Sequence, residues 1–132
     1  MKVTEFDPAL DLIIVPVRIF GRSRAIPLLL AIDTGSSETV NAPEHVDQLG
    51  YSPRDGEAIT TVRSVVGKEQ GYTLRVARFS GLGFEVPDYR IHVFDLPAGY
   101  GIDGLIGLSF LRQFNYEIRS GEGRIFVERT VS

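Results

Sequence analysis

The segment at residues 25–32 reads Ala-Ile-Pro-Leu-Leu-Leu-Ala-Ile and runs directly into Asp33-Thr-Gly. Eight residues is an ordinary strand length, and an almost wholly apolar end favours a strand buried on both faces. Residues 12–20 form a similar apolar run, and the turn-like Gly21-Arg-Ser-Arg separates the two. We therefore predict a hairpin whose second strand ends directly before Asp33.

The rest of the chain consists of short strand candidates separated by glycine and proline, of which it has 14 and 7. A long hairpin is predicted at 58–79 and a strand at 86–94, with a final hairpin formed by 116–119 and 124–128. Pro43 and Gly50 bracket a short helix, and apolar residues at helical spacing over 105–114 predict a second one. The fold class is mostly β, a small barrel or sandwich with one or two short helices.

Composition narrows the function classes. The chain has 132 residues, 43% of them hydrophobic, which predicts one globular domain over 1–132. A net charge of −3 without a basic cluster argues against a nucleic-acid partner. The absence of cysteine excludes disulfides, thiolate metal sites and a cysteine nucleophile. The apolar runs are too short to span a bilayer and the N-terminus lacks a signal-peptide core, so we expect a soluble, cytoplasmic protein.

Asp33 is the candidate reactive group. Gly35 lets another backbone approach closely, and Thr34, Ser36 and Ser37 supply hydroxyls that can orient the carboxylate. Two carboxyls sharing one proton can act together on a peptide bond, one taking a proton from water while the other gives one to the carbonyl oxygen. The chain holds one Asp-Thr-Gly, and Asp103-Gly104 lacks the threonine. The second carboxyl must then come from another chain across a two-fold axis.

A second element strengthens this interpretation. Residues 103–111 read Asp-Gly-Leu-Ile-Gly-Leu-Ser-Phe-Leu, an apolar-apolar-Gly followed by a short amphipathic stretch. Together with the apolar-Asp-Thr-Gly-Ser-Ser turn at 32–37 and Leu49-Gly50, it makes residues 11–127 resemble the retropepsin-like aspartic proteases, most closely the bacterial members of that clan. The resemblance implies a small closed acid-protease barrel with a flap hairpin, working as a homodimer.

The resemblance also implies roles for particular residues. Asp33 would be the catalytic acid and base, Thr34 would bond across the dimer, Gly35 would contact the substrate backbone, and Ser36 would orient the carboxylate. The flap tip would lie near Val65, Val66 and Gly67. The side-chain pocket of the substrate site would be lined by Asp103 and Leu105. The implied reaction is cleavage of an extended peptide, without a metal or other cofactor.

Two departures from the retroviral pattern keep an alternative open. Leu108-Ser109 stands where those proteases carry Arg-Asp or Arg-Asn, and the flap has fewer glycines. The alternative is a catalytically silent dimerisation or peptide-binding module on the same fold. Phosphoryl transfer through Asp33 ranks lower, because it needs magnesium ligands, a downstream lysine and an alternating α/β pattern. The histidines at 45 and 92 are isolated and show no metal-ligand spacing.

Overall fold

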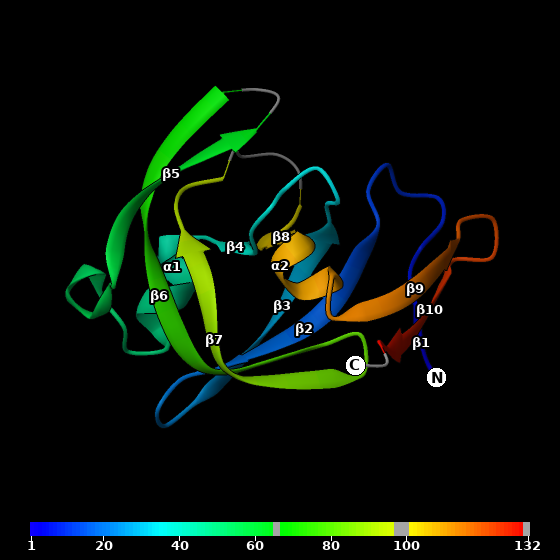
Figure 1. Cartoon of the computed structure of the whole chain (residues 1–132), viewed down its shortest axis with the longest axis horizontal. Helices are drawn as coiled ribbons and strands as arrows, with labels where there is room; N and C mark the ends of the chain where they lie inside the picture. Colours follow the sequence, from blue (N-terminus) through cyan, green and yellow to red (C-terminus); the bar gives the residue numbers. More distant parts are fainter. Residues whose placement is uncertain (65–66, 97–100, 131–132) are drawn as a thin grey trace.

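The computed structural model describes residues 1–64, 67–96 and 101–130. Its main body is a closed six-stranded barrel, as the sequence predicted (Figure 1). In order around the barrel the strands are β2 (Ile14–Phe20), β3 (Ala25–Ile32), β8 (Gly104–Ile106), β4 (Val40–Asn41), β7 (Phe84–Val93) and β6 (Gly67–Gly81). The barrel closes because β6 pairs with β7 along one edge and with β2 at its C-terminal end.

A hairpin projects from this barrel. Strand β5 (Ala58–Ser64) pairs only with β6, in a register that runs from Ala58 opposite Thr73 to Ser64 opposite Gly67. The pairing of β6 with β7 begins at Tyr72, so residues 67–71 pair with β5 alone. In Figure 1 this hairpin rises at the upper left, and the loop that follows β3 rises on the same side of the barrel.

A separate three-stranded sheet lies at the other end of the molecule from the projecting hairpin (Figure 1). It contains β1 (Lys2–Glu5), β10 (Arg124–Arg129) and β9 (Phe114–Arg119), all antiparallel. The sequence predicted the β9–β10 hairpin but not β1. The two chain ends therefore belong to this sheet rather than to the barrel.

The helices are short. Helix α1 (Pro43–Gln48) begins at Pro43, as predicted, and a 3₁₀ turn covers Pro53–Asp55. The predicted helix at 105–114 is wrong in extent, since α2 covers only Leu108–Leu111. Leu105 lies in β8 and Phe114 begins β9. In the part of the chain described, no helix is long and apolar enough to cross a membrane.

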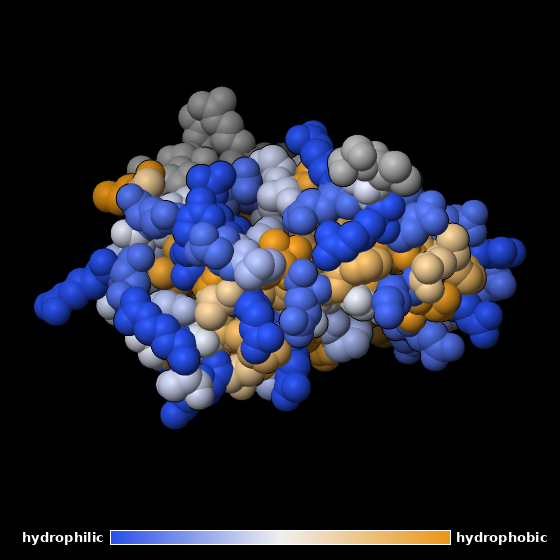
Figure 2. Space-filling model, turned by 60° about the horizontal axis from the view of Figure 1, so that its bottom comes forward, coloured by the Kyte–Doolittle hydropathy of each residue, from blue (hydrophilic) through white to orange (hydrophobic). Residues whose placement is uncertain are grey.

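The barrel interior is filled by apolar side chains from nearly every strand, including Val15, Leu30, Phe79, Ile91, Ile106 and Phe110, each no more than 1% exposed. Phe110 of α2 packs edge-to-face against Phe79 with 5.0 Å between ring centroids, and this contact anchors the helix to the barrel core. The predicted two-sided burial of β3 fails at Leu29, which is 48% exposed. On the face shown in Figure 2, apolar patches lie between hydrophilic side chains.

Candidate active site

Asp33 lies one residue beyond the end of β3 and is half-buried. Its backbone N–H donates to the carbonyl oxygen of Ile106 at 2.9 Å, which extends the ladder between β3 and β8 by one residue. The N–H of Gly35 donates to Asp33 Oδ1 at 2.9 Å, and the N–H of Ser36 donates to the carbonyl oxygen of Asp33. The turn thus holds the carboxylate through its own backbone.

Two segments about 70 residues apart meet behind this turn. The N–H groups of Leu108 and Ser109 donate to the carbonyl oxygens of Ser36 and Ser37, each at 2.9 Å. Gly107 allows this approach, because a Cβ there would lie 2.2 Å from the carbonyl oxygen of Glu38. The structure therefore brings together the Asp-Thr-Gly turn and the apolar-Gly element that the sequence singled out separately.

A buried hydroxyl network supports the same junction. Tyr89 Oη lies 2.9 Å from Thr39 Oγ1 and 3.0 Å from Ser109 Oγ. Thr39 N–H donates to Ser109 Oγ, and Gly107 N–H donates to Thr39 Oγ1. Burial raises the pKa of Tyr89 above its usual 10.0, and the hydrogen bonds to Ser109 and Thr39 oppose that rise. This network could not be predicted from the sequence, because nothing in a lone tyrosine on β7 signals a partner 50 residues away.

The turn residues differ in exposure. Thr34 and Gly35 face solvent, whereas Ser36 is buried. Ser36 Oγ donates to the carbonyl oxygen of Glu38 at 2.8 Å, so the hydrogen bond seen at the Asp33 carboxylate comes from Gly35 N–H rather than from the predicted Ser36 hydroxyl. Thr34 is exposed and makes no side-chain hydrogen bond to the other described residues.

The predicted flap tip falls at the projecting hairpin. Val65 and Val66 lie outside the described residues, and Gly67 begins β6 opposite Ser64. Figure 1 shows that the hairpin and the loop beginning at Asp33 lie on one side of the barrel.

Both carboxylate oxygens of Asp103 have partners within the chain. Its Oδ2 accepts from Leu29 N–H at 2.8 Å, and its own N–H donates to the carbonyl oxygen of Leu29 at 2.7 Å. Its Oδ1 lies 3.5 Å from His45 Nε2 on α1. Asp103 therefore extends the β3–β8 pairing with its side chain, a role that the sequence analysis did not predict. Leu105, the other predicted pocket residue, is half-buried opposite Ala31 and Val40.

The second histidine has an acidic partner too. His92 Nε2 on β7 lies 3.3 Å from Glu38 Oε2, and the two side chains are 9% and 29% exposed. Burial lowers the pKa of His92 below its usual 6.5, with Arg90 adding to the effect and Glu38 opposing it. Sequence spacing gave no sign of this pair, because it forms only when β4 is placed beside β7.

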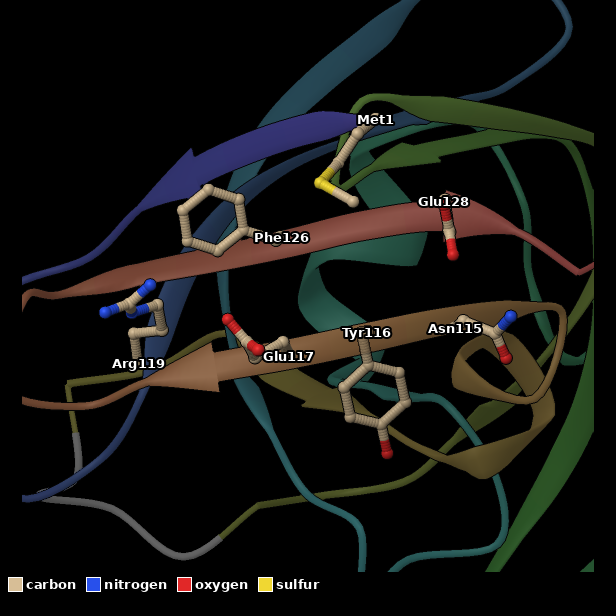
Figure 3. Close-up of a pocket in the computed structure, with 7 residues that line it drawn as sticks. All are labelled: Met1, Asn115, Tyr116, Glu117, Arg119, Phe126 and Glu128. Atoms are coloured by element: carbon tan, nitrogen blue, oxygen red, sulfur yellow. The ribbon is translucent and has the colours of Figure 1, made fainter.

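Two other features could mark a functional site: a metal-binding cluster and a surface hollow. Among the described residues no cluster of three or more His, Cys, Asp or Glu side chains could hold a metal ion. A hollow of about 310 Å³ lies on the three-stranded sheet, between side chains of β9 and β10 and Met1 (Figure 3). None of its lining residues belongs to the Asp33 turn or to α2.

A closed barrel with an Asp-Thr-Gly turn locked onto an apolar-Gly-helix element, together with a projecting hairpin, defines a protein of the retropepsin-like class. The aspartyl protease family model matches residues 15–110, and the chain belongs to that family. A retropepsin-like aspartic protease from Rickettsia conorii has a similar structure, with a TM-score of 0.66 and 17% sequence identity over 95% of this chain and 87% of that one. A search of curated protein sequences finds no match.

Proposed function

We propose that the protein is an aspartic endopeptidase in which two copies of Asp33, one from each chain of a homodimer, activate water between them. The observation that carries this proposal is the turn itself. It fixes one carboxylate through Gly35 N–H and leaves Thr34 and Gly35 open to solvent at its tip. One such turn per chain supplies half of a two-carboxyl site.

The proposed reaction needs the two carboxyls to share one proton, because two like charges that close cannot both ionise. The ionised carboxyl takes a proton from water as the oxygen attacks the peptide carbonyl, and the protonated one gives its proton to the carbonyl oxygen. The carboxyl that took the water proton then gives it to the amide nitrogen, while the other carboxyl takes a proton back from one hydroxyl of the tetrahedral intermediate. The C–N bond breaks, which leaves a carboxylic acid and an amine. Thr34 would bond across the dimer and Gly35 would meet the substrate backbone.

The substrate would be an extended peptide, held as an added strand between the projecting hairpin and the turn. Leu105 would contact its side chains, and its position supports this: it is half-buried on β8, next to the ladder that positions Asp33. The flap-tip residues Val65, Val66 and Gly67 would close over the peptide. Asp103 would shape the pocket wall through its bonds to Leu29 and His45.

The first experiment compares Asp33→Asn with Asp11→Asn on a library of fluorogenic peptides. Asp11 is exposed and makes no side-chain bond to the described residues, so it is a matched control. We expect at least a thousandfold loss of cleavage for Asp33→Asn and none for Asp11→Asn, with circular dichroism unchanged. Full-rate cleavage by Asp33→Asn would exclude Asp33 as the catalyst.

The requirement for two chains has its own test. The wild-type chain is mixed with an equal amount of Asp33→Asn and allowed to exchange subunits. Activity should fall by more than simple dilution, because a mixed dimer has a single ionisable carboxyl at the shared site. Sedimentation equilibrium measures the dimer in parallel. Activity proportional to the wild-type fraction would contradict a shared site. Tight peptide binding without products in the wild-type protein would instead support the silent binding module.

A further inference from the structure

A second hollow, of about 300 Å³, lies between the three-stranded sheet and the barrel. Thr4 of β1 lines one side of it, and residues of β2, β3 and the β6–β7 turn line the other. The two sides meet at the rim, where the side chain of Lys2 packs on Gly83 in that turn (Figure 1). The hollow is therefore a cleft between two sheets.

Strand register places Arg18 in the middle of the barrel side of this hollow. Arg18 pairs with Pro27 of β3 and with Ser80 of β6, so the three side chains project from the same face. That face points away from the barrel core, because the chain neighbours Val17 and Ile19 belong to the core cluster. Arg18 and Pro27 are exposed on it.

The charge in the hollow is positive. Arg18 is the one charged residue among those that line it, and it forms no ion pair with the described residues. The nearest acid by register is Glu85, opposite Ser80, and its carboxylate contacts Arg78 at 3.4 Å. Lys2 adds a second positive charge at the rim. An anion is therefore attracted to this cleft, although the chain as a whole carries a net charge of −3.

The hydrogen-bond donors in the hollow come from side chains. Pro16 and Pro27 line it and have no N–H, which disfavours an added β-strand at these positions. The hydroxyls of Thr4 and Ser80 make no side-chain hydrogen bond to other described residues. Together with the planar guanidinium of Arg18 they suit a ligand with two acceptor oxygens, and the proline rings suit an apolar group beside it.

The hollow is distant from the candidate catalytic carboxylate. Pro27 precedes Asp33 by six residues along β3, which corresponds to about 20 Å of extended chain. None of the lining residues belongs to the Asp33 turn or to α2. A volume of about 300 Å³ is at the lower end for small-molecule sites, so the ligand is small.

We propose that this hollow binds a carboxylate that carries a small apolar group, as found at the C-terminus of a peptide and in a free branched-chain acid. Arg18 holds the carboxylate with two parallel N–H donors, and the apolar group lies against Pro16 and Pro27. The inference goes beyond the proposed peptidase function and does not depend on it.

The test titrates N-acetyl-leucine into the isotope-labelled protein and follows the N–H signals by NMR. We expect a Kd on the order of 1 mM, with shifts concentrated at residues 80–83. N-acetyl-leucine amide lacks the charge and should bind roughly tenfold more weakly. Acetate lacks the apolar group and should also bind more weakly. Equal binding of the amide or of acetate, or shifts that leave residues 80–83 unaffected, would overturn the inference.

Variants of the barrel side test the role of Arg18. Arg18→Gln should weaken N-acetyl-leucine binding roughly tenfold, and Ser80→Glu, which places a carboxylate opposite Arg18, should do the same. Arg54→Gln is the matched control, because Arg54 is exposed on the 3₁₀ turn outside the hollow. Unchanged binding by Arg18→Gln, in a protein whose spectrum shows it folded, contradicts the proposal.

A further arm distinguishes the two sources of the ligand. Binding of 4-methylpentanoate is measured beside that of N-acetyl-leucine, since both carry the same apolar group and one carboxylate. Tighter binding of N-acetyl-leucine assigns the site to peptide C-termini, and tighter binding of 4-methylpentanoate assigns it to free acids. Either result supports a carboxylate site, whereas binding of neither compound overturns it.

Discussion

The carbonyl oxygen of Glu38 occupies the space that a side chain at Gly107 would need, with 2.2 Å to the position of a Cβ. Backbone cannot move aside as a flexible side chain can, and the carbonyl oxygens of the two preceding residues, Ser36 and Ser37, accept hydrogen bonds from α2. The contact therefore makes residue 107 sensitive to the smallest substitution.

We expect Gly107→Ala to lower the free energy of unfolding by about 2–3 kcal/mol, because it overpacks a fixed junction. Peptide cleavage should fall as well, since the turn that holds Asp33 must shift. Urea denaturation measures the first effect. Gly121→Ala is the control, because a Cβ at Gly121 meets nothing within 4 Å. Equal stability of the two variants would contradict the close approach.

Replacing Asp103 tests its role in the sheet. Asp103→Ala removes the acceptor of Leu29 N–H and the partner of His45, so we expect a loss of about 1–3 kcal/mol in chemical denaturation. Asp103→Asn keeps an oxygen for Leu29 N–H and should recover part of that loss. If Asp103→Ala is as stable as Asp11→Ala, the side chain does not brace β3.

Removal of the Tyr89 hydroxyl from the buried network should lower the free energy of unfolding. Tyr89→Phe leaves the hydroxyls of Thr39 and Ser109 without their shared partner in a buried place, and we expect about 1–3 kcal/mol of destabilisation. Tyr116→Phe is the matched change on β9 and should have little effect. Differential scanning calorimetry separates the two, and indistinguishable melting temperatures would show that the network contributes nothing.

His92 predicts a dependence of stability on pH. Its pKa is lowered in the folded protein, chiefly by burial, while Glu38 and Arg90 face it with opposite effects. As pH falls below 6.5, the unfolded chain binds a proton that the folded chain refuses, so the free energy of unfolding decreases. His92→Gln should flatten this part of the curve between pH 7 and 5. Identical slopes for both proteins would mean that His92 titrates normally.

The sequence predicted best where local pattern and final structure coincide. The apolar run before Asp33 became β3 with the predicted bounds, and Pro43 began α1. Prediction from the sequence failed where apolar spacing is ambiguous, since Leu105 and Phe114 fit a helical period but lie in strands. The two residues of β4 are too few to give a pattern at all.

The residues of the candidate site also divide into those that the sequence could predict and those that it could not. The Asp33 turn and Gly107 are short motifs that can be found in a sequence, and the structure brings them into contact. The partners of Asp103, Tyr89 and His92 could not be predicted, because these contacts join separate elements, most of them 50 or more residues apart and the nearest, Tyr89 to Ser109, 20 residues apart. Such contacts follow from the order of strands around the barrel, which periodicity does not determine.

Strand β6 is continuous from the projecting hairpin to the seam where the barrel closes on β2. Gly71 marks the step between these two parts, because a Cβ there would lie 2.0 Å from the carbonyl oxygen of Val93. On the hairpin side of that step, β6 pairs with β5 alone among the strands of the described residues. Bending of the projecting hairpin near Gly71 would therefore break none of the strand pairs that hold Asp33 in place.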